Sequence, residues 1–169
     1  MLEAVLMNSE TKELELVKEL YIHSFPSNER REFNDFLHMN PSCFEPYLFY
    51  DKNIFVGFAF LLTYKDITHI LYFSVIDHLR DHGYGTMILK MIHDMKKGQR
   101  IIADVEREGN TDNDEQRIKR KAFYFKNGFH YSDVKYRWRN ENYDVLVYGE
   151  SFTYEEFHDF WENVDSETI

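Results

Sequence analysis

The sequence predicts an α+β fold, in which a mixed α/β sheet begins as an antiparallel meander, contains one central parallel strand pair and is covered by helices. Three strand-like runs between residues 44 and 76 are joined by short polar turns, and such turns connect antiparallel neighbours. Downstream, an amphipathic helix separates two further strands, which requires a parallel crossover. With 43% hydrophobic and 17% aromatic residues, the chain can bury the core of one domain, which we predict over residues 1–169.

Each element has its own signal. Apolar residues recur at intervals of three and four in the helical segments, most clearly between Tyr84 and Met95. Apolar runs bounded by turn residues mark the strands, and Gly98 and Gly128 stop two helices. Ser9 or Thr11 is the expected cap of the first helix. The strands are predicted at residues 3–7, 44–50, 54–64, 67–76, 100–106, 130–139 and 143–148, and the helices at 10–24, 27–39, 84–98, 115–127 and 152–161.

The net charge and the cysteine content limit which binding partners and which cellular compartment we expect. The formal net charge is −10, so the surface repels nucleic-acid phosphates and anionic lipids, and neither nucleic acid nor membrane is expected as a partner. A single cysteine, Cys43, excludes an internal disulfide. The first residues do not form a signal peptide, and the apolar run at 54–64 is too short to span a bilayer as a helix. We therefore expect a cytoplasmic protein.

The segment between the first two predicted helices contains a carboxylate with two interpretations. Ser27 is a cap for the second helix, which places Glu29 in its first turn. A carboxylate there faces the positive end of the helix dipole, and we interpret Glu29 in this way. The alternative is that Glu29 holds a cationic substrate.

The segment that carries chemistry is Arg80-Asp81-His82-Gly83-Tyr84-Gly85-Thr86, between a strand and a helix. Unpaired N–H groups at a helix start, together with the helix dipole, form an anion site. Two glycines let the backbone approach a ligand closely, and Arg80 and His82 add positive potential. The loop therefore predicts a phosphate or pyrophosphate ligand, against the alternative of a plain strand-to-helix turn.

Two other phosphate-binding loops fit this segment less well. No Gly-Lys-Ser/Thr sequence occurs, which excludes a Walker loop. A dinucleotide fingerprint needs a third glycine where Ile88 stands. Asp104 lies near the distance expected of a ribose-binding carboxylate, so a nucleotide-cofactor enzyme remains an alternative.

Two motifs together resemble a known family. The segment from Val75 to Gly85 resembles the acyl-coenzyme A signature of the GNAT N-acetyltransferase superfamily, a strand followed by Arg/Gln-x-x-Gly-x-Gly/Ala at a helix start. Tyr124-Phe125-Lys126-Asn127-Gly128-Phe129 resembles that family's Tyr-x-x-x-Gly-Phe segment. The two motifs occur in the family's order, separated by one helix and one strand, and the predicted element order agrees over nearly the whole chain.

The resemblance implies a GNAT-like fold in which the central parallel strands splay apart and the pantetheine arm of acetyl-CoA lies between them. It implies a cytoplasmic N-acetyltransferase that acts on a primary amine, and by family analogy a homodimer through the late strands. The positions implied to bind the cofactor are Phe73, Ser74, Val75, Arg80, Asp81, His82, Gly83, Tyr84, Gly85 and Thr86.

The sequence differs from the usual family pattern at several positions. Asp81 stands where glycine, asparagine or a basic residue is usual, and its carboxylate is expected to point to solvent, away from a pyrophosphate. Arg117 and Arg120 replace a frequent asparagine and alanine. The basic residues of that helix either meet the phosphates or form a solvated face, and we favour a solvated face for most of them.

Amine acylation requires a base, an acid and an oxyanion donor. Glu106, at the end of its strand, is the first candidate base, and Asp104, on the same face by strand alternation, is the second. A simple solvated strand-end carboxylate is the alternative for Glu106. The matched motif implies Tyr124 as the general acid for the thiolate, against a core aromatic, and a backbone N–H near Val75 as the oxyanion donor.

Metal and covalent chemistry are not expected. The eight histidines form no His-x-x-x-His helix motif with a supporting acid, so we predict no metal site. Cys43 is far in sequence from both motifs and is interpreted as a buried apolar group. A non-catalytic acyl-CoA-binding or sensing module remains the alternative function.

Overall fold

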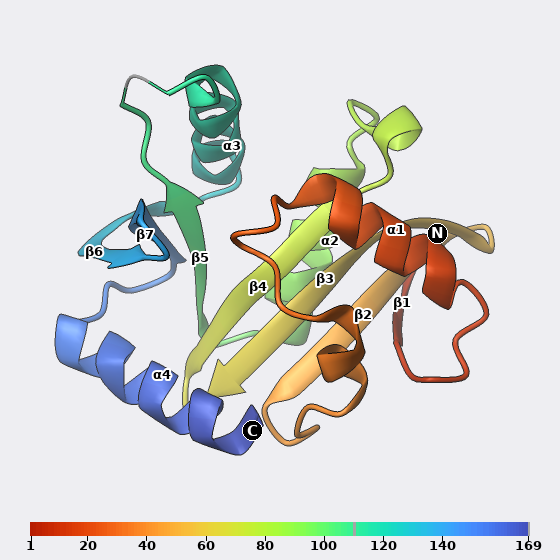
Figure 1. Cartoon of the computed structure of the whole chain (residues 1–169), viewed down its shortest axis with the longest axis horizontal. Coiled ribbons are helices and arrows are strands. Elements are labelled where there is room, and N and C mark those ends of the chain that lie inside the picture. The colour runs from red at the N-terminus through yellow and green to blue at the C-terminus, as the bar shows by residue number, and fades with distance from the viewer. Residues whose placement is uncertain (110, 169) are drawn as a thin grey trace.

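One seven-stranded sheet runs through the computed structural model, which describes residues 1–109 and 111–168. The strand order is β1-β2-β3-β4-β5-β7-β6. Within the described residues β4 and β5 are the parallel pair, and the other neighbours are antiparallel (Figure 1). The strands are β1 (Leu2–Leu6), β2 (Phe44–Asp51), β3 (Ile54–Tyr64), β4 (Ile67–Val75), β5 (Arg100–Glu106), β6 (His130–Trp138) and β7 (Glu141–Tyr148).

Helices cover both faces of this sheet. Helices α1 (Leu14–Ser24) and α4 (Tyr154–Thr168) pack on one face, where Val17 and Phe160 join an aromatic-rich core. Helices α2 (Tyr84–Met95) and α3 (Asp114–Lys126) cover the other face through Ile88 and Tyr124. The predicted α+β fold with a mixed sheet is therefore confirmed. Not one of the described helices has an apolar stretch long enough to cross a bilayer.

A bulge in β4 separates the two central strands. Tyr72 pairs with Phe60 of β3 and Ile70 pairs with Leu61, so Leu71 between them has no partner on β3. The same point ends the parallel ladder, because the last pair between β4 and β5 joins Ile70 to Ala103. A bulge bends its strand and increases its twist, and Figure 1 shows β4 and β5 together at their starts and apart at their ends. The splayed pair that the resemblance implied is present.

The predicted helix over residues 27–39 is wrong. That segment is a set of turns followed by a short 3₁₀ helix at Phe33–Leu37. Its backbone carbonyls bind side chains from distant strands: Tyr72 donates to the carbonyl of Glu29 at 2.7 Å, and Arg139 donates to those on either side of it. Tertiary hydrogen bonds have replaced helical ones, and Glu29 does not lie in the first turn of a helix.

The first helix begins later than predicted. It starts at Leu14 without a side-chain cap. The hydroxyl of Thr11 instead accepts from the N–H of Asn8 at 2.9 Å, and the Asn8 side chain accepts from the N–H of Glu10 at 2.8 Å. Residues 8–11 therefore form a hydrogen-bonded turn before the helix, of the kind that competes with helical pairing.

Gly57 allows β3 to approach the end of β4 closely, where it pairs with Val75. A Cβ at this position would lie 2.4 Å from the carbonyl oxygen of Ser74 and 3.1 Å from the Cα of Val75. We predict that Gly57→Ala lowers the free energy of unfolding by about 1–3 kcal/mol, because backbone must shift to admit the methyl group. Urea unfolding measures the change, and Ile54→Ala, on the same strand but 62% exposed, is the control. Equal stabilities of the two variants would contradict the prediction.

Candidate active site

The end of β4 presents unpaired backbone groups to the gap beside β5. The N–H of Ile76 donates to the carbonyl of Val56 at 2.9 Å. The backbone groups of Ile76 therefore point toward β3. Backbone direction alternates along an antiparallel strand, and the backbone groups of Phe73 and Val75 therefore point away from β3. The side chain of Arg80 confirms this direction, because its Nε donates to the carbonyl of Val75 at 3.2 Å.

The loop before α2 collects backbone donors. Gly83 is the residue before the helix and has a φ of 84°, in the left-handed region that favours glycine. The N–H of Met87 makes the first helical hydrogen bond, to the carbonyl of Gly83 at 3.0 Å. Among the described residues, no backbone acceptor pairs with the N–H groups from Asp81 to Thr86. These unpaired donors lie at the positive end of the helix dipole, where the sequence predicts an anion site.

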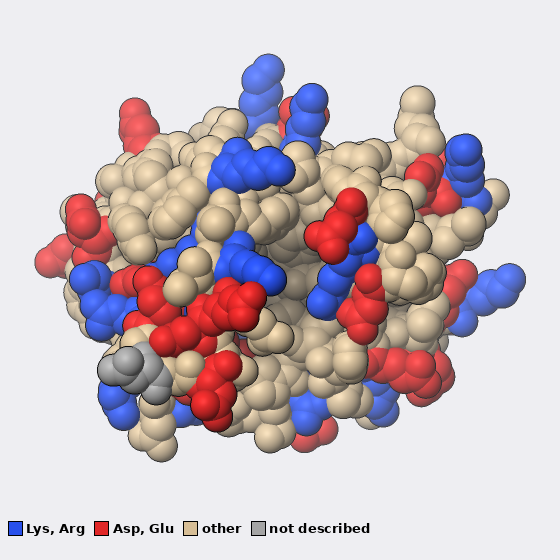
Figure 2. Space-filling view, turned by 90° about the horizontal axis from the view of Figure 1, so that it is seen from above, with Lys and Arg blue, Asp and Glu red and all other residues tan. Residues whose placement is uncertain are grey.

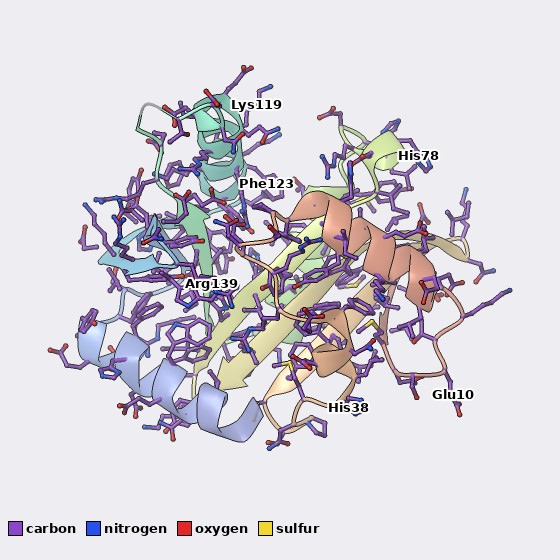
Figure 3. The ribbon with its side chains drawn as sticks, viewed as in Figure 1. Glu10, His38, His78, Lys119, Phe123 and Arg139 are labelled. Atoms are coloured by element: carbon purple, nitrogen blue, oxygen red, sulfur yellow. The ribbon has the colours of Figure 1, made fainter. Side chains whose placement is uncertain are left out.

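A groove of about 640 Å³ joins the strand end to this loop. Phe123 and Lys119 of α3 lie across it (Figure 3), and a hollow with charged side chains on its flanks is visible from above (Figure 2). Asp81 is exposed and lines the groove. Nine of the ten predicted cofactor positions line the groove: Phe73, Ser74, Val75, Arg80, Asp81, Gly83, Tyr84, Gly85 and Thr86. The tenth, His82, does not line it, and its ring nitrogen Nδ1 hydrogen-bonds the carbonyl of Arg80.

A second cavity, of about 340 Å³, lies on the face of the sheet covered by α1 and α4. It contains three carboxylates, Glu29, Asp104 and Glu106, and its walls are largely aromatic. Phe25 and Arg120 line both the groove and this cavity. The two spaces therefore meet at these two side chains, and the candidate base Glu106 lines the cavity and interacts electrostatically with Arg120.

Glu29 and Glu106 form a carboxyl pair in that cavity. Burial, and then a hydrogen bond to Glu106 and its negative charge, raise the pKa of Glu29 to about 8. At neutral pH Glu29 is therefore mostly protonated and shares its proton with Glu106. Arg117 of α3 reaches the other side of Glu106, with 2.7 Å between Nη2 and Oε2. The pair thus carries one proton and one negative charge, and Arg117 compensates that charge.

Tyr124 is buried on α3, only 2% exposed, and lines the groove. Burial raises the pKa of Tyr124, while the charge and hydrogen bond of Arg120, one helical turn earlier, oppose the rise. A guanidinium group has donors and no acceptor, so the Tyr124 oxygen accepts from Arg120. The hydroxyl of Tyr124 can therefore donate its own proton to another group.

The remaining basic residues of α3 divide between two surroundings. Arg117 and Lys121 are buried, and Lys121 lies 2.8 Å from both Glu108 and Asp144. Lys119 and Lys126 line the groove instead. The expected solvated face is therefore wrong for the two buried residues, since their partners come from β5, β7 and the segment after β5. Sequence spacing alone carries no signal of those partners.

Comparison with known proteins identifies the family. A model described as the acetyltransferase (GNAT) family matches residues 12–129. The sequence has no significant match among curated proteins. A protein of the GNAT family from Bacteroides thetaiotaomicron is 19% identical, with a TM-score of 0.81 over 99% of both chains.

Two further solved structures have the same fold. A GNAT family acetyltransferase from Elizabethkingia anophelis with acetyl-CoA bound is 17% identical, with a TM-score of 0.61 over 88% of this chain and 98% of that one. A Bacillus subtilis acetyltransferase in complex with CoA is 18% identical, with a TM-score of 0.62 over 89% and 99%. Because the family model covers more than half of the sequence, the chain belongs to the acetyltransferase (GNAT) family and is an acyltransferase. Its described residues contain no group of three or more side chains suited to hold a metal ion.

Arg139, at the turn between β6 and β7, binds the backbone on both sides of Glu29. Its Nη1 donates to the carbonyls of Asn28 at 3.0 Å and Arg30 at 3.3 Å. Figure 3 shows it between the sheet and the connection that follows α1. We predict that Arg139→Ala lowers kcat/KM about tenfold to a hundredfold, because Glu29 loses its placement against Glu106. Steady-state kinetics measure the loss, and exposed Arg137→Ala is the control. Unchanged kinetics in Arg139→Ala would contradict this role.

Proposed function

We propose that this acetyltransferase moves an acetyl group from acetyl-CoA to a primary amine by direct attack of the amine on the thioester. One observation carries the proposal: the groove and the acidic cavity meet at Arg120, next to both Tyr124 and the Glu29–Glu106 pair. A donor bound in the groove and an amine bound in the cavity would meet there. The acetyl-CoA and CoA bound to two structural relatives support the choice of donor.

The cofactor fits the unpaired groups of the groove. The N–H groups of residues 81–86 are proposed to bind the pyrophosphate, and Lys119 and Lys126 add positive charge across the groove. The edge formed by Phe73, Ser74 and Val75 is proposed to hydrogen-bond the pantetheine arm as an added strand. The side chain of Arg80 already donates a hydrogen bond to the Val75 carbonyl. When the pantetheine arm binds, this side chain would move away or share that acceptor.

The carboxyl pair is the proposed base. An alkyl ammonium ion with a pKa near 10.4 must lose a proton before it attacks. A pair that titrates near 8 accepts that proton with a smaller free-energy cost than an ordinary carboxylate with a pKa near 4.3. Glu106 remains the proposed proton acceptor, directly or through water, with Glu29 hydrogen-bonded beside it. Asp104, the second candidate, binds the hydroxyl of Tyr136 in the cavity.

Tyr124 and the β4 edge would complete the reaction. As the amine nitrogen bonds to the carbonyl carbon, the electron pair of the C=O bond moves to oxygen, where the N–H of Val75 is the proposed donor. The C–S bond then breaks, the sulfur takes the Tyr124 proton, and the positively charged nitrogen loses a proton to water to leave the neutral amide. Arg120 stabilises the tyrosinate that forms, and this oxygen regains a proton from solvent or, through water, from the carboxyl pair. The products are the amide and CoA with a free thiol.

Release of free CoA thiol tests the function. Acetyl-CoA incubated with a panel of primary amines should release thiol only when an amine is present. Glu106→Gln and Tyr124→Phe should each slow release about 100-fold or more while calorimetry still detects CoA binding. Binding without release for any amine would indicate a non-catalytic acyl-CoA module. The absence of binding would contradict the proposal altogether.

The carboxyl pair also predicts a pH profile. The base acts when deprotonated, so kcat/KM should rise as the pH increases through about 8, below the titration of the free amine near 10.4. Glu29→Gln should abolish this rise, because the shared proton is gone. Glu32→Gln, at an exposed neighbouring position, is the control and should keep it. A Glu29→Gln enzyme with an unchanged profile would contradict the role of the pair.

A further inference from the structure

Asp104 has an unused acceptor in the cavity. Its Oδ2 accepts from the hydroxyl of Tyr136, while its Oδ1 is buried with no hydrogen-bond partner among the described residues. His69, on β4, is 2% exposed, and its Nε2 lies 3.1 Å from Asp104 Oδ2. Neither ring nitrogen of His69 makes a hydrogen bond within the described part of the chain. Buried polar groups normally have partners, so this group is suited to a polar ligand atom.

The lack of a basic partner distinguishes Asp104 from two other carboxylates that are largely removed from solvent. Glu106 pairs with Arg117, and Asp144 pairs with Lys121. In the described structure no lysine or arginine pairs with Asp104, and its neighbour is the imidazole of His69. A buried carboxylate without a cation is costly. A positively charged ligand group beside Oδ1 would remove that cost.

The position of Asp104 sets the distance between two ligand groups. Asp104 and Glu106 are two residues apart on one face of β5, which corresponds to roughly 6–7 Å along the strand. Both side chains line the same cavity, together with aromatic rings that include Tyr72, Tyr143 and Trp161. Aromatic faces attract cations and tolerate a methylene chain. The cavity therefore offers two acidic positions along β5 and an aromatic wall beside them.

We propose that Asp104 binds a second ammonium group of the acceptor, so that the preferred substrates are short aliphatic diamines. One nitrogen lies at the Glu29–Glu106 pair and reacts, and the other, roughly 6–7 Å away, donates to Asp104 Oδ1. Tyr136 fixes the orientation of the carboxylate through Oδ2. His69 lies against the ring of Trp161, with centroids 5.0 Å apart, which places it between α4 and Asp104. This inference rests on the proposed amine acetylation and names its substrate class.

A comparison of straight-chain diamines, monoamines and amino alcohols of equal length tests the proposal. In the wild-type enzyme, kcat/KM for the best diamine should exceed that for the matched monoamine about tenfold to a hundredfold. The amino alcohol should resemble the monoamine. Equal values for all three classes would overturn the anchor while leaving amine acetylation intact.

The variant Asp104→Asn separates anchoring from catalysis. It should raise KM for the diamine about tenfold or more and abolish the preference for the diamine over the matched monoamine. Asp35→Asn, at an exposed site in the 3₁₀ helix, is the control. Calorimetry of the diamine against the CoA-loaded protein gives a readout independent of turnover, and Asp104→Asn should weaken that binding as well. Thiol release with no amine would overturn the proposed function. Unweakened diamine binding in Asp104→Asn would overturn the anchor.

Discussion

The loss of pairing between β4 and β5 after Ile70 and Ala103 creates both spaces of the site. An unpaired residue, Leu71, bends β4 at that point. Beyond it, the backbone groups of Phe73 and Val75 have no strand beside them, and the end of β5 is free to carry its carboxylates into a cavity. Continuous pairing would satisfy these groups and close the gap. The strand edge and the two spaces are thus consequences of one local irregularity.

Opposite charges are arranged around the point where the groove meets the cavity. Arg120 lies there, with Tyr124 on one side and the Glu29–Glu106 pair on the other. The paired carboxyls share one proton because burial and mutual repulsion disfavour two charges in one place. Arg117 lies behind them. In the proposed mechanism, the carboxyl pair therefore holds one proton at neutral pH, and the Tyr124 hydroxyl can donate its own proton.

The parts of the site that are continuous in sequence were predictable. The loop at residues 80–86 and the Tyr124 motif carry their own spacing, and the strands before and after them are long apolar runs. The role of Glu29 was not predictable in the same way. Its segment contains good helix signals, but its carbonyls bind Tyr72 and Arg139, and its carboxyl meets Glu106 from a distant strand. Such partners are set by tertiary contacts, which override local propensity.

A crystal structure with CoA bound tests the central claim most directly. The account predicts a pyrophosphate that accepts hydrogen bonds from the N–H groups of residues 81–86, and a pantetheine arm that lies along Phe73–Val75 with its sulfur near Tyr124. A cofactor bound elsewhere, or the arm outside the gap between β4 and β5, would contradict it.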